Sequence, residues 1–525
     1  MLKRLLPLLM SAALGLAPSI CNSQANSNKA AKAVSKSVAT DERIHRVETG
    51  IPPIPTPEKS GPMQVDVRKL MEIFKVPGLS IAVIDDFKIA WTKAYGVTAI
   101  GGTESVTTKT LFQAGSISKP VAATGALYLV EHGKLSLDDD VDNKLVTWKV
   151  PENEFTKDQK VTLRRLMTHS AGLTVHGFPG YATTEPIPTL VQIFNGEKPA
   201  NTAPIRVDFV PGSKVRYSGG GVTIEQQLMM DVTGMPFPQF MQKNVLDKIG
   251  MTDSSYEQPL PSARAALTAT GTYEDGKPVP GKWHIYPEMA AAGLWTTPTD
   301  LAKFAIEIAL SKQGKANHVL SQAMAREMLR PQIERVGLGF FLGDEKEPDR
   351  FGHGGADEGF QADLIMFGDS GQGIAIMGNS DNFFRVAPYV EDSVAKEYGW
   401  KSAPHDHPVG PVLVLMEAMQ GTQAAIEEFR YLKQAHLPEY KVDENSLNQL
   451  GYTLLQGKKI NDAIQVFKLN VQEYPRHWNC YDSLGEAYMN AGQKDLAIQN
   501  YEKSVELNPQ NENGINMLKK LKGDK

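Results

Sequence analysis

The chain has 525 residues and a formal net charge of −5 at pH 7, from 55 Lys and Arg against 60 Asp and Glu. Hydrophobic residues make up 41% of it and charged residues 22%, as in ordinary soluble globular proteins. This composition excludes collagen-like, disordered and polytopic membrane classes, and the length predicts several domains. Because the chain has no global positive charge to attract nucleic acid, we expect no nucleic-acid partner.

The N-terminus has the pattern of an export signal. The basic pair Lys3 and Arg4 precedes an apolar run over residues 5–20. A Ser-x-Ala step that ends at Ala25 then resembles a cleavage site. We therefore predict a signal peptide over 1–25 and an exported protein, periplasmic or secreted, with no membrane span after signal removal. A membrane anchor is the alternative, but the apolar run contains two prolines and is shorter than the ~20 residues that a span needs.

The cysteine content limits the chemistry. Cys21 and Cys480 are too few for a disulfide framework or a Cys-based zinc site. We therefore expect any catalytic nucleophile to be oxygen rather than sulfur, and no metal or organic cofactor is implied. A lipoprotein would use Cys21, although the bulky Ile20 before it fits that modification poorly.

The predicted elements begin after a linker. Residues 26–61 are rich in Lys, Ser and Ala and then in Pro, which predicts a flexible linker with little apolar surface to bury. We assign the next domain to 62–404. It opens with a helical apolar period over 65–75, followed by a hairpin with strands at 79–84 and 89–91.

Two further elements are well marked near the end of this domain. A helix over 301–310 is preceded by Thr297 as a cap, with Asp300 at the position of a capping-box acid. A second hairpin is predicted from strands at 361–367 and 373–377. Strands at both ends with helical and loop stretches between them favour an α+β fold.

The last hundred or so residues repeat with a 34-residue period, which is typical of tetratricopeptide repeats. A degenerate unit near Phe429 precedes the two clear ones, so we count two and a half helical pairs and assign 411–525 to a tetratricopeptide-like domain. Two interpretations stay open: a groove that docks a protein partner, or a stabilising appendage. The pairs that show the period are Gly451 with Gly485, Ala463 with Ala497, Phe467 with Tyr501, and Pro475 with Pro509.

Ser116 and Lys119 form the first chemical motif. Their S-x-x-K spacing at the start of an apolar helix places both side chains on one helical face. A serine hydroxyl is a weak nucleophile that needs a neighbouring base, and a partly buried lysine can act as one. The helix N-terminus adds N–H groups that favour a developing oxyanion.

Two glycine-rich stretches follow. Tyr217 and Ser218 stand before three glycines, an arrangement that can hold a tyrosine rigidly near a site while the backbone bends. His353-Gly354-Gly355-Ala356 stands before the 361–367 strand, where glycines permit close approach of a ligand. Taken alone, each stretch is equally compatible with an ordinary loop or strand entry.

Together the three motifs resemble the serine β-lactamase and penicillin-binding-protein superfamily, in the branch of class C β-lactamases, esterases and D-amino-acid peptidases. The resemblance covers about residues 62–400, with supporting stretches that begin at Val76, Leu166 and Ala291. It implies an antiparallel sheet flanked by helices plus a helical subdomain, here followed by the all-α repeats.

By this resemblance Ser116 is the acylated nucleophile, Lys119 its proton partner, and Tyr217 the general base or acid. The oxyanion hole would be formed by the backbone N–H groups of Ser116 and Ala356. His353, Gly354 and Gly355 occupy the place of the family's Lys-Thr-Gly motif, and Ser218 belongs to the same substrate-binding set.

The chain departs from the family pattern at two positions. The family's Tyr-x-Asn is Tyr217-Ser218-Gly219 here, and His353 replaces the lysine that reads a substrate carboxylate. An unperturbed histidine is mostly neutral at pH 7, so Arg216 or Arg350 would have to supply the lost charge. Both departures favour an esterase, amidase or peptidase over a potent β-lactamase.

The leading hypothesis is an exported serine hydrolase that acts on a small-molecule or peptide ester or amide through an acyl-enzyme. The alternative is a catalytically weak binding or sensing protein whose repeats dock a partner, and a role in cell-wall synthesis also stays open. Two other patterns are interpreted as structural: Ser370 as a turn residue, and His405-Asp406-His407 as a linker rather than a metal site.

Overall fold

The computed structural model of the chain describes residues 39–51, 54–56, 63–401, 405 and 407–523. The predicted signal peptide lies outside the described residues. Residues 39–49, inside the predicted linker, form a helix. None of the helices in the described ranges has the length and apolar character needed to span a bilayer.

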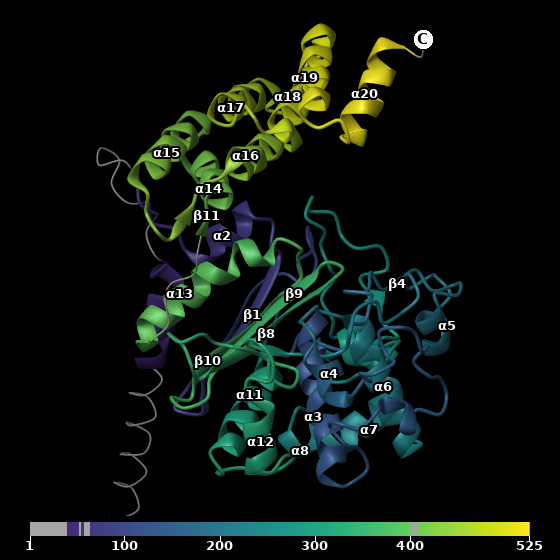
Figure 1. The fold of residues 1–525 in the computed structure, drawn as a ribbon. Helices are drawn as coiled ribbons and strands as arrows, with labels where there is room; N and C mark the ends of the chain where they lie inside the picture. The colour runs from purple at the N-terminus through teal and green to yellow at the C-terminus, as the bar shows by residue number, and fades with distance from the viewer. Residues whose placement is uncertain (1–38, 52–53, 57–62, 402–404, 406, 524–525) are drawn as a thin grey trace, which may run out of the picture. The chain divides into compact units, whose positions relative to one another are not determined.

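A six-stranded antiparallel sheet organises the first domain, with the strand order β2-β1-β10-β9-β8-β7 (Figure 1). Its register pairs segments that are far apart in the sequence, since Leu79 of β1 faces Gly378 of β10. The strands are β1 (Gly78–Asp85), β2 (Lys88–Gly96), β7 (Phe341–Leu342), β8 (Arg350–Asp357), β9 (Phe360–Phe367) and β10 (Gln372–Gly378). Three two-stranded pieces accompany the sheet: β3 (Phe112–Gln113) with β6 (Trp295–Thr296), β4 (Tyr181–Ala182) with β5 (His284–Ile285), and β11 (His407–Pro408) with β12 (Tyr440–Lys441).

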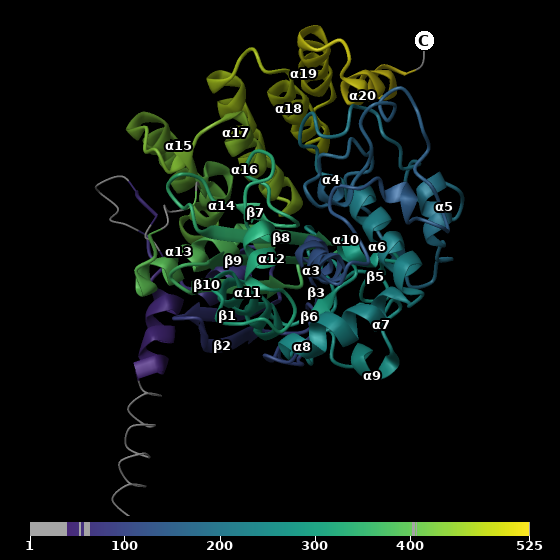
Figure 2. The same cartoon turned by 60° about the horizontal axis from the view of Figure 1, so that its bottom comes forward.

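Helices pack on the sheet and form a cluster of their own. Helix α11 lies against β1, β9 and β10, whereas α3, α6 and α10 pack on one another (Figure 2). The result is the predicted α+β fold. The helices of this domain are α2 (Val67–Ile73), α3 (Ser118–Glu131), α4 (Leu163–Met167), α5 (Leu190–Asn195), α6 (Gly219–Thr233), α7 (Phe237–Met241), α8 (Asp247–Ile249), α9 (Ser262–Ala265), α10 (Met289–Ala292), α11 (Pro298–Lys312), α12 (Gln322–Met328) and α13 (Ala387–Tyr398).

Local sequence signals explain several of these elements. The Thr297 hydroxyl accepts the Asp300 N–H at 3.3 Å and begins α11, as the sequence predicts. The capping-box role of Asp300 is wrong: its carboxylate accepts instead from the Asp253 N–H at 2.8 Å and the Ser254 hydroxyl at 2.9 Å. These two partners come from a loop distant in the sequence, which a local pattern does not reveal; a third, Lys303, lies three residues along α11 and its Nζ donates to Asp300 Oδ1 at 2.8 Å.

The repeat region is all helical, and the count of two and a half pairs is too low. The degenerate unit is a full pair, because α14 precedes α15; its nearly all-apolar sequence lacks the amphipathic period that marks the other repeats. In the two clear repeats a glycine of the first helix faces an aromatic ring of the second, Gly451 at Phe467 and Gly485 at Tyr501. The helices are α14 (Val409–Gln420), α15 (Thr422–Ala435), α16 (Glu444–Gln456), α17 (Ile460–Glu473), α18 (Trp478–Asn490), α19 (Lys494–Leu507) and α20 (Glu512–Lys522).

Candidate active site

Ser116 lies on one turn of 3-10 helix, η1 (Gly115–Ile117), directly before α3. Gly115 has a φ of +51°, in the left-handed region that favours glycine, so the chain can turn sharply from β3 into the helix. Ser116 is partly exposed, whereas the residues on both sides of it are buried. Ser116 is therefore the partly exposed residue of an otherwise buried turn.

Lys119 lies three residues after Ser116 and is only 3% exposed. Its Nζ donates to Ser116 Oγ at 2.8 Å and to the Ala291 carbonyl oxygen, on α10, at 2.7 Å. A buried ammonium is costly unless it is hydrogen-bonded, so these two acceptors fix the position of the lysine. The structure thus brings together the two residues of the S-x-x-K motif.

Tyr217 stands immediately before α6, and its ring lies 4.9 Å from Lys119 Nζ. Ser218 caps that helix: its hydroxyl accepts the Gly221 N–H at 3.0 Å and donates to the Thr174 carbonyl oxygen at 2.8 Å. The Ser218 side chain is buried and engaged in the cap, so in this structure it positions its neighbour Tyr217.

His169 supports Tyr217 from the other side. The two ring centroids lie 4.3 Å apart, and His169 Nδ1 accepts the N–H of Ser218 at 3.2 Å. The His169 side chain is buried, and burial, followed by the charge of Lys119, holds its pKa well below the usual value. The imidazole is therefore neutral, as its acceptor role requires.

His353 lies on β8 with its ring 6.1 Å from that of Tyr217. Its Nδ1–H donates to the carbonyl oxygen of Gly354 at 2.6 Å. Burial, and then the charge of Lys119, lowers the pKa of His353 to about 3. The side chain that stands in place of a lysine is consequently uncharged at neutral pH.

The glycines of β8 allow that strand to touch the Ser116 turn. A Cβ on Gly355 would collide with the Ala114 carbonyl oxygen, and a Cβ on Gly115 would collide with the backbone of Ala356. The backbones of η1 and of Ala356 are therefore adjacent, which is the arrangement that two N–H donors of an oxyanion hole require. Gly354 is oriented differently, since a Cβ there would meet the ring of Phe384.

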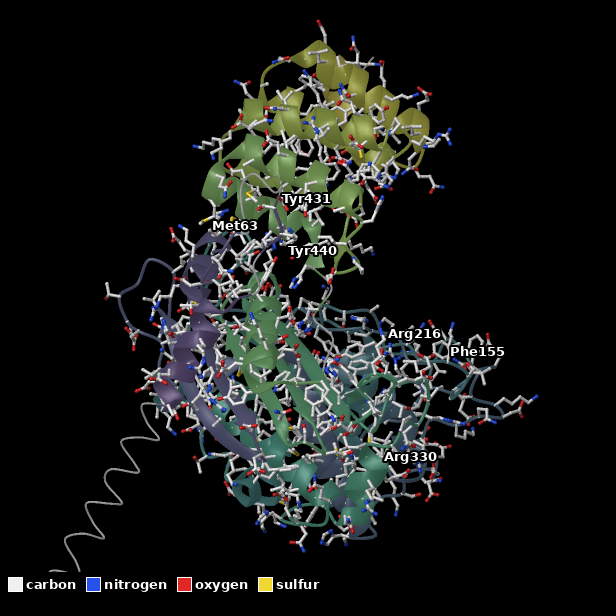
Figure 3. All side chains as sticks on the ribbon, turned by 90° about the vertical axis from the view of Figure 1, so that its left-hand side faces the viewer. Met63, Phe155, Arg216, Arg330, Tyr431 and Tyr440 are labelled. Atoms are coloured by element: carbon white, nitrogen blue, oxygen red, sulfur yellow. The ribbon has the colours of Figure 1, made fainter. Side chains whose placement is uncertain are left out.

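The two arginines that might replace the lost positive charge are both engaged. The guanidinium of Arg216, labelled in Figure 3, donates to the two carboxylate oxygens of Asp208 at 2.9 and 2.5 Å and to the Gly172 carbonyl oxygen at 3.0 Å. Arg350 Nη1 lies 3.4 Å from a carboxylate oxygen of Glu347. Each arginine is thus paired with a carboxylate.

Sequence reasoning assigned no role to three residues that the structure places at the site. His169 lies in a stretch that supported the family resemblance, but nothing local shows that it contacts Tyr217. The carbonyl of Ala291 and the exposed ring of Phe341 likewise reach the site through tertiary folding. Phe341 lies 5.0 Å from the His353 ring and 6.1 Å from the Tyr217 ring, centroid to centroid.

The residues interpreted as structural lie away from Ser116 in the sequence. Ser370 lies in the turn between β9 and β10. His405 and His407 both contact Asp392, through Nδ1 at 2.7 Å and Nε2 at 3.0 Å. Among the residues that the structure describes, no three His, Cys, Asp or Glu side chains are arranged to hold a metal ion.

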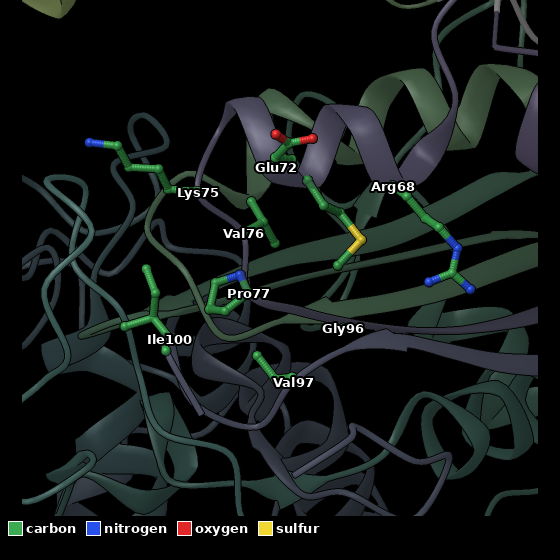
Figure 4. Close-up of a pocket in the computed structure, with 10 residues that line it drawn as sticks. Arg68, Glu72, Lys75, Val76, Pro77, Gly96, Val97 and Ile100 are labelled. Carbon is green, nitrogen blue, oxygen red and sulfur yellow. The ribbon is translucent and has the colours of Figure 1, made fainter. Parts of the chain in front are cut away.

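A separate pocket of about 340 Å³ lies between α2 and the segment after β2 (Figure 4). Met71, Val76, Pro77 and Ile100 give it an apolar lining, with charged side chains such as Arg68 beside them. Its lining contains no serine, cysteine, histidine or tyrosine. The pocket is thus distinct from the side chains gathered around Ser116.

Comparisons with known proteins place the chain in a family. The beta-lactamase family model matches residues 65–396, and a tetratricopeptide repeat model matches residues 478–511. A beta-lactamase from Pseudomonas fluorescens is 30% identical over 262 residues, or 49% of this chain and 66% of that protein. An unguisins hydrolase from Aspergillus violaceofuscus is 25% identical over 364 residues, which is 61% of each chain.

The fold is also found among solved structures. The octameric penicillin-binding protein homologue from Pyrococcus abyssi superposes with a TM-score of 0.53 at 22% identity, over 63% of this chain and 76% of that one.

Proposed function

Because the chain belongs to the beta-lactamase family, we propose that it is an exported serine hydrolase that cleaves an ester or amide through an acyl-enzyme on Ser116. The observation that carries this proposal is the buried Lys119, whose Nζ lies 2.8 Å from Ser116 Oγ. A lysine fixed in this way can assist loss of the serine proton and stabilise the resulting alkoxide. The relatives named as beta-lactamase and hydrolase support the same class of chemistry.

In the acylation step, Ser116 Oγ forms a bond to the substrate carbonyl carbon. Its proton passes to the phenolate oxygen of Tyr217, which the Lys119 ammonium stabilises, and the carbonyl oxygen becomes an oxyanion held by the N–H groups of Ser116 and Ala356. Tyr217 then returns the proton to the leaving alcohol or amine as the C–O or C–N bond breaks. Ser116 is left as an ester.

In the deacylation step, a water molecule attacks the same carbonyl carbon. The water loses one proton to the Tyr217 and Lys119 pair, and the bond between Ser116 Oγ and the acyl carbon breaks as that proton returns to Oγ. The acid is released and the free serine is restored. We assign Tyr217 the general acid or base role because its ring contacts Lys119 directly.

The charges at the site favour substrates without a carboxylate. His353 is neutral, while Arg216 and Arg350 are paired with acids. Carboxylate recognition is strongest with an available cation, and these residues offer none. An uncharged ester or amide therefore fits better than a β-lactam or a peptide that presents its C-terminal carboxylate.

A matched pair of thioesters tests this charge preference. The S-ethyl thioesters of butyric acid and of succinic acid have similar length, but only the second carries a carboxylate. We expect kcat/KM, followed by release of ethanethiol, to favour the butyryl substrate at least tenfold. Equal values for the two substrates would contradict the charge argument.

Intact mass after treatment with a fluorophosphonate tests the nucleophile. We expect one adduct on the wild-type protein, formed with loss of fluoride, and none on Ser116→Ala. Ser370→Ala, which changes an exposed turn serine, serves as the matched control and should be labelled like the wild type. If Ser116→Ala is labelled as fully as the wild type, Ser116 is not the nucleophile.

Export and the repeats complete the proposal. We propose that the signal over 1–25 directs the protein to the periplasm or the medium, and N-terminal sequencing of protein recovered there should begin after Ala25. A chain that retains Met1 in the cell would oppose export. The tetratricopeptide match over 478–511 supports a second role, in which the repeats bind a protein partner. If the protein binds ligands but takes no fluorophosphonate, the weakly catalytic binding protein becomes the better description.

A further inference from the structure

Phe341 has no part in the reaction steps above, yet its ring is exposed beside them. Its side chain is 41% exposed, whereas the preceding Phe340 is 1% exposed and packs between Phe304 and Phe351. Phe340 directly precedes β7 and Phe341 begins it, and successive side chains of extended backbone point in opposite directions, so one ring is buried and the next is exposed. An exposed aromatic ring at this place is available to contact an apolar group of a substrate.

The contacts of Phe341 connect it to the nucleophile. Its ring is nearly parallel to that of Tyr217, with an interplanar angle of 18° and a centroid distance of 6.1 Å. The Tyr217 ring contacts Lys119, and Lys119 donates to Ser116. Phe341 is therefore the outer member of a row of contacts that ends at the reacting hydroxyl.

Further rings complete this surface. His353 lies 5.0 Å from Phe341, and His176, which is exposed, lies 4.9 Å from Tyr217. We call Tyr217, His353, Phe341 and His176 the ring cluster. His353 is uncharged, and the nearby Arg216 is occupied by Asp208, so this part of the site offers ring faces rather than an available cation.

We propose that Phe341 is a specificity residue that packs against an uncharged aryl group of the substrate. This inference rests on the proposed function and narrows its substrate class to neutral esters or amides that bear an aromatic group. Aryl groups suit this place because a second ring can stack on or abut Phe341 while the rest of the cluster excludes water. Contact of one ring pair, added to the apolar area that it buries, corresponds to about a tenfold gain in kcat/KM.

Thioesters that carry a single aryl group, on one side of the scissile bond or on the other, test the proposal. The S-ethyl thioester of phenylacetic acid carries the aryl group on the acyl side, and S-benzyl thioacetate carries it on the thiol side. S-ethyl thioacetate is the reference that lacks a ring. We expect wild-type kcat/KM to favour one aryl substrate over the reference by at least tenfold.

Variants of Phe341 then decide whether this ring is responsible. Phe341→Leu should reduce the aryl preference, measured as the ratio of kcat/KM for the aryl substrate to kcat/KM for the reference in the same variant, to within about threefold. Phe341→Tyr keeps a ring and should retain the preference. Leu267→Ala is the control, because Leu267 is an apolar residue in another loop and is 54% exposed. This variant should behave like the wild type.

Two results would overturn the proposal: no preference for either aryl substrate in the wild type, or a preference that survives in Phe341→Leu. Failure of the hydrolase itself is distinguishable, because then neither thioester turnover nor a fluorophosphonate adduct is seen. In that case the binding of N-benzylacetamide to Ser116→Ala tests whether Phe341 contacts an aryl group. We expect its Kd to rise about tenfold when Phe341→Leu is added, and an unchanged Kd would reject the aryl contact.

Discussion

The buried imidazole of His169 packs on the ring of Tyr217, and the backbone and side chain of His169 together hold the backbone on both sides of that tyrosine. The His169 carbonyl oxygen accepts the Arg216 N–H at 2.8 Å, and His169 Nδ1 accepts the Ser218 N–H at 3.2 Å. His169 has a φ of +55°, in the left-handed region that favours glycine and in which asparagine, aspartate and histidine are the enriched side-chain-bearing residues. The position of Tyr217 thus depends on a neutral histidine in a left-handed backbone conformation.

Variants of His169 should separate positioning from chemistry. His169→Gly keeps the backbone conformation but removes the ring and the Nδ1 acceptor, so we expect kcat to fall about 10- to 100-fold with little change in KM. His169→Asn tolerates the same φ and offers a side-chain oxygen to the Ser218 N–H, so it should stay within about fivefold of wild type. Steady-state kinetics on S-ethyl thioacetate measure both. Equal losses in the two variants would contradict the hydrogen-bonding role.

Tyr217→Phe should reduce kcat by about 10²- to 10⁴-fold, as is typical when a general acid or base is lost. The aromatic ring remains, so its packing against His169 and the fold should persist. Single-turnover kinetics together with an unchanged melting temperature would check this. Wild-type turnover in this variant would remove Tyr217 from the proton path.

Gly355→Ala should abolish turnover, because the added Cβ would collide with the Ala114 carbonyl oxygen and separate β8 from the Ser116 turn. Gly177→Ala is the matched control, since nothing lies within 4 Å of a Cβ at that position. The rate of fluorophosphonate labelling compares the two variants. Comparable rates in both would mean that close contact between the strand and the turn is not needed.

The buried Glu225 predicts a pH dependence of stability. Burial raises its pKa to about 8, from the usual 4.5 of the unfolded chain. The folded state therefore holds a proton that the unfolded state has released, and stability falls as pH rises from about 4.5 to 8. Within this window, each increase of one pH unit lowers the free energy of unfolding by up to about 1.4 kcal/mol.

Glu225→Gln keeps the shape of the side chain and removes this titration. Relative to wild type, the variant should gain about 1 to 4 kcal/mol in unfolding free energy between pH 5 and pH 8. Glu288, whose pKa burial also raises to about 8, is present in both proteins and cancels in the difference. Urea unfolding at three pH values measures the effect. If the unfolding free energies of wild type and variant changed equally with pH, the prediction would be refuted.

Much of the architecture follows from short-range patterns. The Thr297 cap, the β9–β10 hairpin and the facing of Ser116 and Lys119 each depend on residues a few positions apart, so they are legible in the sequence. Helix α14 was missed because its apolar residues show no amphipathic period. The boundaries of the predicted domains and the assigned roles of the site residues stay predictions.

By itself, the amino-acid sequence determined the family resemblance, the fold class and the 34-residue repeat, because these depend on residue type and spacing. The tertiary structure decided the electrostatics of the site. Lys119 Nζ donates to a carbonyl oxygen 172 positions away in the sequence. Burial keeps His353 neutral, and Arg216 forms an ion pair with Asp208. Burial and long-range pairing exist only once the chain has folded, and both set the charge of a group through desolvation and nearby ions, which no local pattern encodes.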